Sequence, residues 1–444
     1  MDEKFPGYAF AGIEDVTRLG VGVEENARIL HRFAYLERQF MQVVAGHLIG
    51  VPEWEVKILL GRHLYEDSEH HQLLRTRITE LRKSERSVDR VPDEALAVVI
   101  DELIRAQNTV ELLTGLSQVL KPALAAAYQA HIRISNPLVD YNTGRLLRLI
   151  LLEEEEHVRL GQAYLATLLT SDAARAQAAA FAAHLEAFLA VAGGVSGGAP
   201  RLTLAALPPA RSDGQPFRLP LASRRDPRFG VTVPKNPATY VPDYGDRTRE
   251  GLEQMMWVRF HEMSPAETVS SILYLEKDRE WKFIYDLARH CWDEIRHSAF
   301  GQAALQAEQI DPTQNPNWIG FAEMALSQLN PMEAYTHLTV AIEQAAMKYP
   351  PGKRQEYEFC RDQAQHALMA LYQDYDWADE VNHSQFGQEW VIKHEHHGDR
   401  AAAIAAGQDT VQRRAAFFQQ FLKEGEELDG ISKKATGGQG DIGY

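Results

Sequence analysis

Apolar residues recur at intervals of three and four along most of this chain, the spacing typical of amphipathic α-helices. In the first half this pattern predicts helices over about 24–49, 53–82, 92–131 and 139–170, the third interrupted at Lys121-Pro122, and an alanine-rich helix near 171–192. In the second half it predicts helices over about 248–277, 279–306, 317–349, 353–392 and 400–427. The predicted fold class is therefore all-α.

Glycine and proline interrupt the helical pattern for one long stretch, at residues 192–245. We interpret this stretch as a linker lying over the surface between two helical domains. The expected organisation is an N-terminal segment, a first domain, the linker, a second domain, and a C-terminal helix with a disordered tail, at residues 1–23, 24–191, 192–245, 246–398 and 399–444.

The two domains look like copies of one another. Residues 53–70 and 280–297 share Glu-Trp at their start, Arg-His in the middle and His at their end, with a constant offset of 227. Residues 154–161 and 380–387 share the pattern Glu-x-x-His-x-x-x-Gly. The offsets lie between 225 and 231 over the whole comparison, which predicts a duplicated unit of four helices.

The strongest chemical signal is a Glu-x-x-His pair that occurs on two predicted helices, as Glu294 with His297 and as Glu380 with His383. Side chains three residues apart project from the same helix face, so each pair can hold a metal ion. Glu343 lies on the helix between them, and a further Glu precedes them on the first helix of the domain. Four carboxylates and two imidazoles form the ligand set of a dimetal site in a four-helix bundle and suit iron or manganese.

The first ligand is either Glu262 or Glu267, because both precede Glu294 by a distance that suits a helical hairpin. The repeat favours Glu267, which matches Glu37 of the first domain. However, Ser264-Pro265-Ala266-Glu267 also fits a capping box at a helix start. A capping role for Glu267 would leave Glu262 as the better ligand, so both alternatives stay open at this point.

Asp293-Glu294-x-Arg296-His297 resembles the Asp-Glu-x-Arg-His signature of the di-iron hydroxylases in the ferritin-like superfamily. Asp379-Glu380-x-x-His383 resembles its second copy, with Asn382 in place of the arginine. The resemblance covers about 150 residues of four-helix pattern. It implies that Asp293 and Asp379 orient metal-bound imidazoles and that Arg296 pairs with a buried carboxylate. The departure at Asn382 leaves open whether the chain belongs to the hydroxylase branch or only to the broader superfamily.

The same resemblance implies an oxidoreductase with two iron ions that activates dioxygen to oxidise or hydroxylate a small organic substrate. Manganese, or a mixed manganese and iron pair, is an alternative. An external electron donor is expected, because no motif in the chain suggests flavin or iron–sulfur binding. Two other functions stay open: an iron-handling or peroxide-detoxifying protein, and a non-catalytic metal-binding scaffold. No catalytic residue beyond the metal ligands is assigned.

The first domain carries a weaker version of the ligand set. Asp67 and Gln118 stand where the second domain has Glu294 and Glu343, and Glu111, two turns before Gln118, is a substitute for the lost carboxylate. We expect an inactive or altered site, which leaves open weak binding, binding of one metal, or a scaffold role. The candidate residues are Glu37, Asp67, His70, Glu111, Gln118, Glu154 and His157.

The charge of the chain excludes two classes of partner. Lys and Arg number 46 against 62 Asp and Glu, a formal charge of -16 that repels nucleic acid and anionic membranes. The start, MDEKFPGYAF, has no basic region followed by an apolar core, and no apolar run is long enough to cross a bilayer. We expect a cytoplasmic protein whose partners are dioxygen, a small molecule and the electron donor, with a homodimer as an open oligomeric state.

Overall fold

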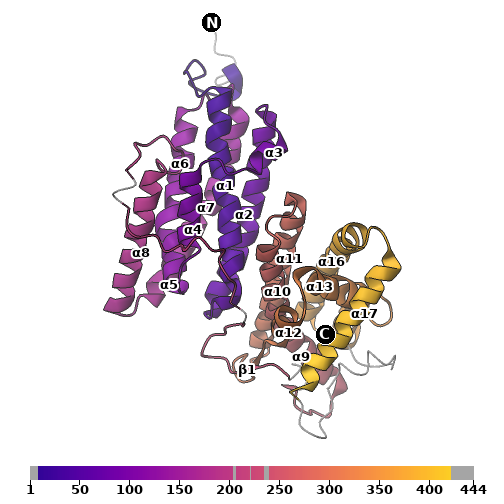
Figure 1. The fold of residues 1–444 in the computed structure, drawn as a ribbon. Helices are drawn as coiled ribbons and strands as arrows, with labels where there is room; N and C mark the ends of the chain where they lie inside the picture. The colour runs from indigo at the N-terminus through magenta and orange to yellow at the C-terminus, as the bar shows by residue number, and fades with distance from the viewer. Residues whose placement is uncertain (1–8, 204–206, 221, 235–239, 422–444) are drawn as a thin grey trace, which may run out of the picture. The chain divides into compact units, whose positions relative to one another are not determined.

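A computed structural model describes residues 9–203, 207–220, 222–234 and 240–421. Within these ranges the chain is helical except for loops and two short strands, β1 (Val231–Thr232) and β2 (Asn317–Trp318), which pair in parallel (Figure 1). The all-α prediction is therefore confirmed. Among the described residues, no helix has both the length and the apolar character that crossing a bilayer requires.

The chain divides into two compact units. Unit 1 comprises residues 1–44 and 63–218, and unit 2 comprises residues 45–62 and 219–444. The boundary between the units falls inside the glycine- and proline-rich stretch, at Arg218 and Leu219. Part of that stretch is buried rather than spread over the surface, because Arg225 pairs with a buried carboxylate, Glu267.

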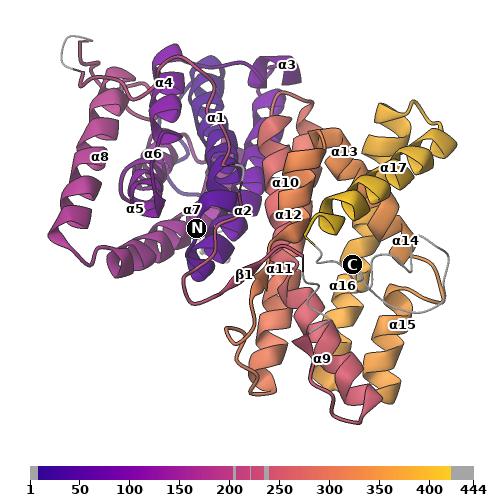
Figure 2. The ribbon, with the colours of Figure 1, turned by 60° about the horizontal axis from the view of Figure 1, so that its bottom comes forward.

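Unit 1 is built from long helices whose polar side chains meet in its interior. Glu37, His70, Lys121 and Glu154, one from each of four helices, form a connected set of ion pairs. The helices that lie wholly or mainly in unit 1 are α1 (Val23–His47), α2 (Trp54–Glu80), α3 (Glu85–Val88), α4 (Glu94–Leu103), α5 (Thr109–Leu113), the π-helical stretch η3 (Thr114–Leu120), α6 (Lys121–Ile134), α7 (Tyr141–Leu168) and α8 (Asp172–Val191) (Figure 2). The end of α1, from residue 45, and the start of α2, to residue 62, belong to unit 2. The first turn of α1 is preceded by a short 3₁₀ turn, η1 (Ala9–Gly12), and its last turn is followed by another, η2 (Leu48–Gly50).

The predicted third helix of unit 1 is interrupted at residues 104–108 and not at Lys121-Pro122. The Asn108 side chain accepts a hydrogen bond from the Glu111 backbone N–H (3.0 Å), which starts a new helix there. Pro122 is tolerated because it falls in the first turn of α6, directly after the π-helical stretch. The prediction of an interruption at Lys121-Pro122 was therefore wrong.

Unit 2 is organised around α11 (Trp281–Ala307), which packs against α9 (Arg247–Phe260), α10 (Met263–Leu275) and α16 (Ala367–Phe386). Its remaining helices are α12 (Gly320–Gln328), α13 (Pro331–Thr336), the π-helical stretch η6 (His337–Glu343), α14 (Gln344–Ala346), α15 (Lys353–Glu358), the π-helical stretches η7 (Phe359–Gln363) and η8 (Gly387–Glu395), and α17 (Arg400–Gln419). The disordered tail expected after the last helix lies outside the described residues.

Two of the predicted helices of unit 2 that are broken in the structure contain a local signal for the break. Pro265 has no backbone N–H to continue the helical ladder, and the His261 carbonyl accepts from Ser264 instead (3.1 Å), so the chain bends between α9 and α10. Asn330 and Glu333 form a capping box that starts α13. Glu262 lies in the first of these bends, which decides its role in the site below.

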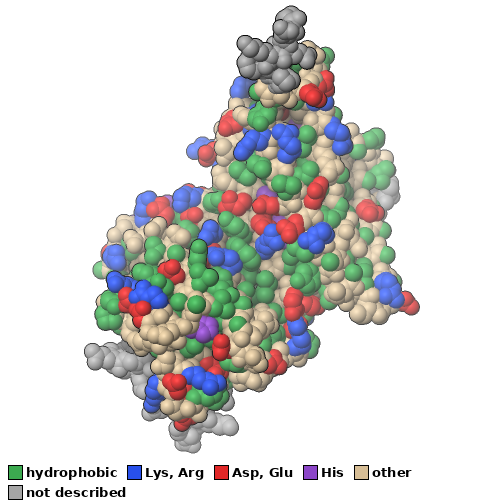
Figure 3. All heavy atoms as spheres, turned by 180° about the vertical axis from the view of Figure 1, so that it is seen from behind, with side chains coloured by type: hydrophobic (Ala, Val, Ile, Leu, Met, Phe, Trp, Pro, Cys, Tyr) green, Lys and Arg blue, Asp and Glu red, His purple; other side chains and the backbone are tan. Residues whose placement is uncertain are grey.

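The surface of the molecule mixes charges. On the face drawn in Figure 3, acidic and basic side chains are interspersed. The net charge of -16 is therefore not gathered in a single acidic patch on that face.

Helix α17 is fixed to η6 through a buried histidine, His337. Its Nδ1 lies 3.0 Å from Thr410 Oγ1, and its Nε2 lies 3.5 Å from Arg414 Nη1. The Thr410 hydroxyl donates to the Gly407 carbonyl, so it accepts from Nδ1–H, while Nε2 accepts from the guanidinium. Burial, followed by the charge of Arg414, lowers the pKa of His337 well below 6.5, so the imidazole stays neutral.

We expect His337 to make the protein less stable as the pH falls below about 6.5. The unfolded chain binds a proton there and the folded chain does not, so the free energy of unfolding falls by at most about 1.4 kcal/mol per pH unit. Urea denaturation at pH 6.5, 6.0 and 5.5, compared with His337→Gln, measures this effect. Glutamine keeps one donor and one acceptor but does not titrate, so equal slopes for parent and variant would contradict the assignment.

Candidate metal centre

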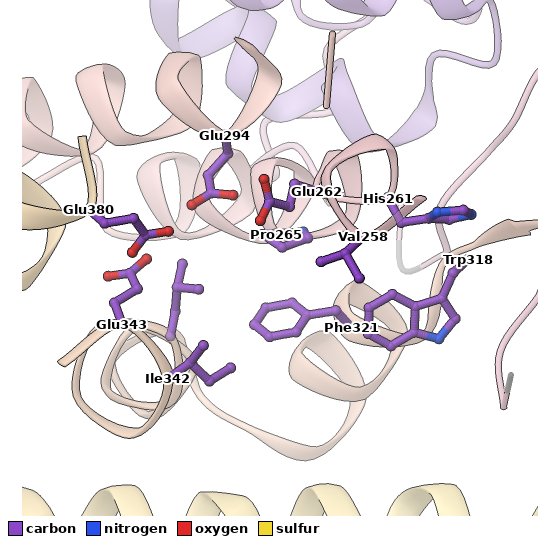
Figure 4. Close-up of a pocket in the computed structure, with 11 residues that line it drawn as sticks. Val258, His261, Glu262, Pro265, Glu294, Trp318, Phe321, Ile342, Glu343 and Glu380 are labelled. Carbon is purple, nitrogen blue, oxygen red and sulfur yellow. The ribbon is translucent and has the colours of Figure 1, made fainter. Parts of the chain in front are cut away.

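Four carboxylates of unit 2 point toward one another across a small space (Figure 4). Glu262 comes from the bend before α10, Glu294 from the middle of α11, Glu343 from the end of η6 and Glu380 from α16. Each residue is at most 4% exposed. Carboxylates repel one another in a buried space, so this arrangement needs either positive charge or bound protons among them.

Two histidines face the same space with their Nδ1 atoms. His297 Nδ1 lies 3.5 Å from Glu262 Oε2, and His383 Nδ1 lies 3.7 Å from Glu294 Oε1 and 3.6 Å from Glu343 Oε1. The structure therefore brings together six of the residues predicted from the sequence. It arranges them, with two further residues, in three groups whose ligand atoms lie within 4.8 Å of one another: His290, Glu294, Glu343 and His383; Glu262, Glu294 and His297; His297, Asp376 and Glu380.

The inward-facing atoms of this cluster lack hydrogen-bond partners. Buried polar atoms are nearly always hydrogen-bonded, so a concentration of exceptions in one place needs an explanation. All five are atom types that ligate metals, and their lone pairs face the shared space. They are Glu262 Oε2, His297 Nδ1, Glu343 Oε2, Glu380 Oε2 and His383 Nδ1. A metal pair is the group that these residues fit.

Two aspartates orient the histidines from the side away from the shared space. Each aspartate contacts the histidine of the other Glu-x-x-His motif. His383 Nε2 lies 3.4 Å from Asp293 Oδ2, and His297 Nε2 lies 3.3 Å from Asp379 Oδ2. Arg296 bridges the aspartates, with a distance of 2.6 Å to Asp379. In the neutral imidazoles Nε2 carries the proton, because a carboxylate can only accept, and Nδ1 is left free to ligate. The Asp293, Arg296 and Asp379 side chains thus lie where the resemblance placed them.

Two cations lie at one end of the cluster. Lys353 Nζ is 3.0 Å from Glu380 Oε1 and 3.0 Å from Asp376 Oδ2. Arg259 Nη1 is 2.5 Å from Glu262 Oε1 and 2.8 Å from Asp376 Oδ1. These contacts use the outer oxygens of the two glutamates and leave the inner oxygens free for a ligand.

The pKa values of the cluster express its crowding. Burial raises the pKa of Glu262 to about 8, against the lowering effect of Arg259. Burial alone would lower the pKa of His297, but the charge of Asp376 and the hydrogen bond to Asp379 raise it to about 9. Excess negative charge in a dry site is thus the dominant electrostatic feature, which a divalent cation would relieve.

Four residues of this site were not assigned to it from the sequence. His290 and Asp376 each lie one helical turn before a predicted ligand, Glu294 and Glu380, so a search of the same helix face would have found both. The ring of His290 stacks on that of His383 with a centroid distance of 3.8 Å. No local signal identifies Lys353 and Arg259, since their partners are distant in sequence.

Glu267 lies outside the cluster. Its carboxylate pairs with Lys57 and Arg225 and accepts from Ser223 Oγ (2.8 Å). The predicted capping box is also wrong, because α10 begins at Met263 and Ser264 Oγ accepts from the Ala322 backbone instead (3.0 Å). Of the two alternatives for the first ligand, only Glu262 is near the other ligands.

A related cluster lies inside unit 1. Glu37, Asp67, His70 and Glu154 are buried, with one ligand atom each within 4.8 Å of the others. His157 is adjacent, 3.2 Å from Glu154 and stacked on His63 at 3.9 Å, as His383 stacks on His290 in unit 2. The difference is Lys121, whose Nζ lies 2.6 Å from both Asp67 and Glu154.

Glu111 and Gln118 do not belong to the unit 1 cluster. Gln118 is exposed, because the π-helical stretch around it turns this position outward and places Lys121 inward. Glu111 is buried elsewhere and pairs with Arg211 (2.7 Å). The prediction that Gln118 or Glu111 belongs to the unit 1 site was therefore wrong.

A narrow pocket leads to the unit 2 cluster. Glu262, Glu294, Glu343 and Glu380 form one end of it (Figure 4). The rest of the wall is mainly apolar and consists of Val258, His261, Pro265, Trp318, Phe321, Leu338 and Ile342.

Comparisons with known proteins assign no family to this geometry: no family model, no curated protein and no solved structure matches the chain.

Proposed function

We propose that unit 2 is a ferritin-like helical bundle that binds two iron ions and activates dioxygen to oxidise or hydroxylate a small organic substrate. Manganese, or a mixed pair, is the alternative metal content. The observation that carries this proposal is the set of five unpartnered ligand atoms that converge in a buried, carboxylate-rich space. Mixed carboxylate and imidazole ligands favour iron and manganese over metals that prefer thiolate.

The three groups of ligand atoms divide into two positions for ions. Glu262 and His297, with Asp376 and Glu380 beside them, would hold one ion, and Glu343, His383 and His290 would hold the other. Glu294 belongs to groups at both positions and would therefore contribute its carboxylate to both ions. When bound and reduced, such a pair supplies electrons to dioxygen.

The chain's own residues prepare this chemistry in two ways. Asp293 and Asp379 hold the imidazoles with Nδ1 facing inward, and Lys353 and Arg259 partly neutralise the outer carboxylate oxygens. Val258, Phe321 and Leu338 keep water out and present an apolar wall, which favours a small and largely apolar substrate. Electrons would come from an external donor.

A second function is favoured by the narrowness of the pocket. The space beside the carboxylates admits molecules of about the size of water, dioxygen or peroxide without side-chain movement. A peroxide-detoxifying or iron-handling protein would need no more than this. An organic substrate would require Phe321 or Ile342 to move.

Metal analysis combined with dioxygen uptake tests the proposal. Full-length protein produced with iron or manganese is analysed for metal, reduced without air, and mixed with dioxygen. We expect about two ions bound in unit 2 and uptake by the iron form. Asp286→Asn is the control, since Asp286 lies on the same helix but pairs with Lys282 (2.9 Å) outside the cluster.

The outcomes separate the alternatives. Metal in unit 2 with dioxygen uptake supports the proposal, and uptake stimulated by an added apolar substrate supports an oxygenase. Consumption of peroxide but not of dioxygen would favour the second function. Absence of metal from unit 2 would leave only a scaffold role.

A further inference from the structure

We infer that unit 1 carries a binding site for one divalent cation, manganese or iron, in which the ammonium group of Lys121 replaces the second ion of a pair. The ligands would be Glu37 from α1, Asp67 and His70 from α2, and Glu154 from α7. This site is separate from the metal centre proposed for unit 2 and does not depend on it.

The unpartnered atoms of unit 1 point to a ligand. Glu37 Oε2, Asp67 Oδ2, His70 Nδ1 and Glu154 Oε2 are buried without a hydrogen-bond partner. The other atoms of these side chains are engaged: Glu37 Oε1 accepts from the Tyr128 hydroxyl, and His70 Nε2 lies 2.8 Å from Glu153 Oε2. In the neutral ring, Nδ1 therefore directs its lone pair at Glu37 Oε2, 3.4 Å away. Two acceptors that close to each other must share a positive charge, which is either a proton on Nδ1 or a metal ion.

Lys121 contacts only some of the polar atoms of this cluster. Its Nζ donates to Asp67 Oδ1 (2.6 Å), Glu154 Oε1 (2.6 Å) and His157 Nδ1 (3.1 Å). An ammonium group has three N–H donors, so these contacts use all of them. The lysine thereby takes His157, the counterpart of His383, out of the ligand set and leaves His70, the counterpart of His297.

The charges of the cluster also allow a divalent ion. Three fully buried carboxylates, Glu37, Asp67 and Glu154, face one ammonium, which leaves two negative charges for protons on the imidazoles or for a divalent ion to balance. Uncompensated buried charge is strongly unfavourable. One divalent cation neutralises it, and a donor set of three carboxylates with one imidazole suits manganese or iron.

The test uses full-length Glu294→Ala protein, in which unit 2 has lost its bridging carboxylate. After loading with Mn²⁺ and removal of excess metal, we expect about one Mn²⁺ per chain, with the electron paramagnetic resonance signal of an isolated ion. Adding His70→Ala should abolish the signal. Adding Glu155→Gln, which changes an exposed carboxylate next to Glu154, should leave it unchanged.

A second variant, made in the same Glu294→Ala protein, tests the role of the lysine. Lys121→Glu removes the ammonium and adds a carboxylate, so Mn²⁺ binding should rise to about two ions per chain, with a signal altered by coupling between them. Absence of bound Mn²⁺ in the Glu294→Ala protein, or its retention after His70→Ala, would overturn the inference. If unit 2 binds no metal at all, the parent chain alone would show the isolated signal, so the two proposals can fail separately.

Discussion

Replacing Glu294 with alanine is expected to remove both ions from unit 2. Glu294 belongs to groups at both positions of the cluster: it lies with Glu262 and His297 in one, and its Oε1 is 3.5 Å from His290 Nε2 and 3.7 Å from His383 Nδ1 in the other. Without it, each position loses a charged ligand, and the two ions lose the group that would screen them from each other. Elemental analysis should show a decrease of about two ions per chain relative to the parent.

Two further variants serve as comparisons for Glu294→Ala. Glu343→Ala removes a ligand from only one group, so one position should keep its ion more strongly than the other. Asp379→Asn keeps every ligand but weakens the support of His297 and the pairing with Arg296, and it should weaken metal binding by about 10- to 100-fold without abolishing it. A Glu294→Ala protein that retained one tightly bound ion in unit 2 would show that Glu294 does not bridge.

Helical periodicity explains why the two motifs of unit 2 could be predicted from the sequence. Glu294 with His297, and Glu380 with His383, are pairs within a single helix turn, so their relative positions depend only on local geometry. Features fixed by fewer than five consecutive residues of one helix were therefore accessible. The supporting roles of Asp293 and Asp379 were expected from the resemblance alone, because each aspartate contacts the histidine of the other motif.

The first ligand required knowledge of contacts that are distant in sequence. Glu262 and Glu267 are both buried glutamates near a proline, and nothing local separates them. The separation comes from Lys57, which lies 210 residues before Glu267, and from the bend that turns Glu262 toward His297. The repeat does not separate them either, because Glu262 and Glu267 lie 225 and 230 residues after Glu37, both within the range of the other offsets.

The third helix of each unit shows a different limit of prediction from the sequence. Both contain a seven-residue π-helical stretch, η3 and η6, which ends directly before Lys121 in unit 1 and at Glu343 in unit 2. A π-helix has more residues per turn than an α-helix, so it rotates the following residues relative to α-helical spacing. An alignment of the two repeats matched Gln118 with Glu343, whereas the structure directs Lys121 to the cluster.

We expect Glu267→Gln to destabilise the protein strongly while leaving metal binding intact. Glu267 neutralises Lys57 and Arg225, whose side chains are at most 1% exposed. Burial already lowers the pKa of Lys57 to about 8, although Glu267 opposes this shift. Removing the carboxylate leaves two buried cations without their anionic partner, so the free energy of unfolding should fall by about 3–5 kcal/mol. Urea denaturation of the metal-free proteins measures this change.

Glu262→Gln is the matched comparison, only five residues away and equally buried. Burial raises the pKa of Glu262 to about 8, so in the metal-free protein the side chain is mainly protonated near neutral pH, and Arg259 would keep Asp376 and Glu356 as partners after the change. The metal-free Glu262→Gln protein should therefore lose little stability but bind metal poorly, the reverse of Glu267→Gln. If Glu267→Gln instead lost metal with little effect on unfolding, Glu267 would be the ligand and the bend at Glu262 would have no part in the site.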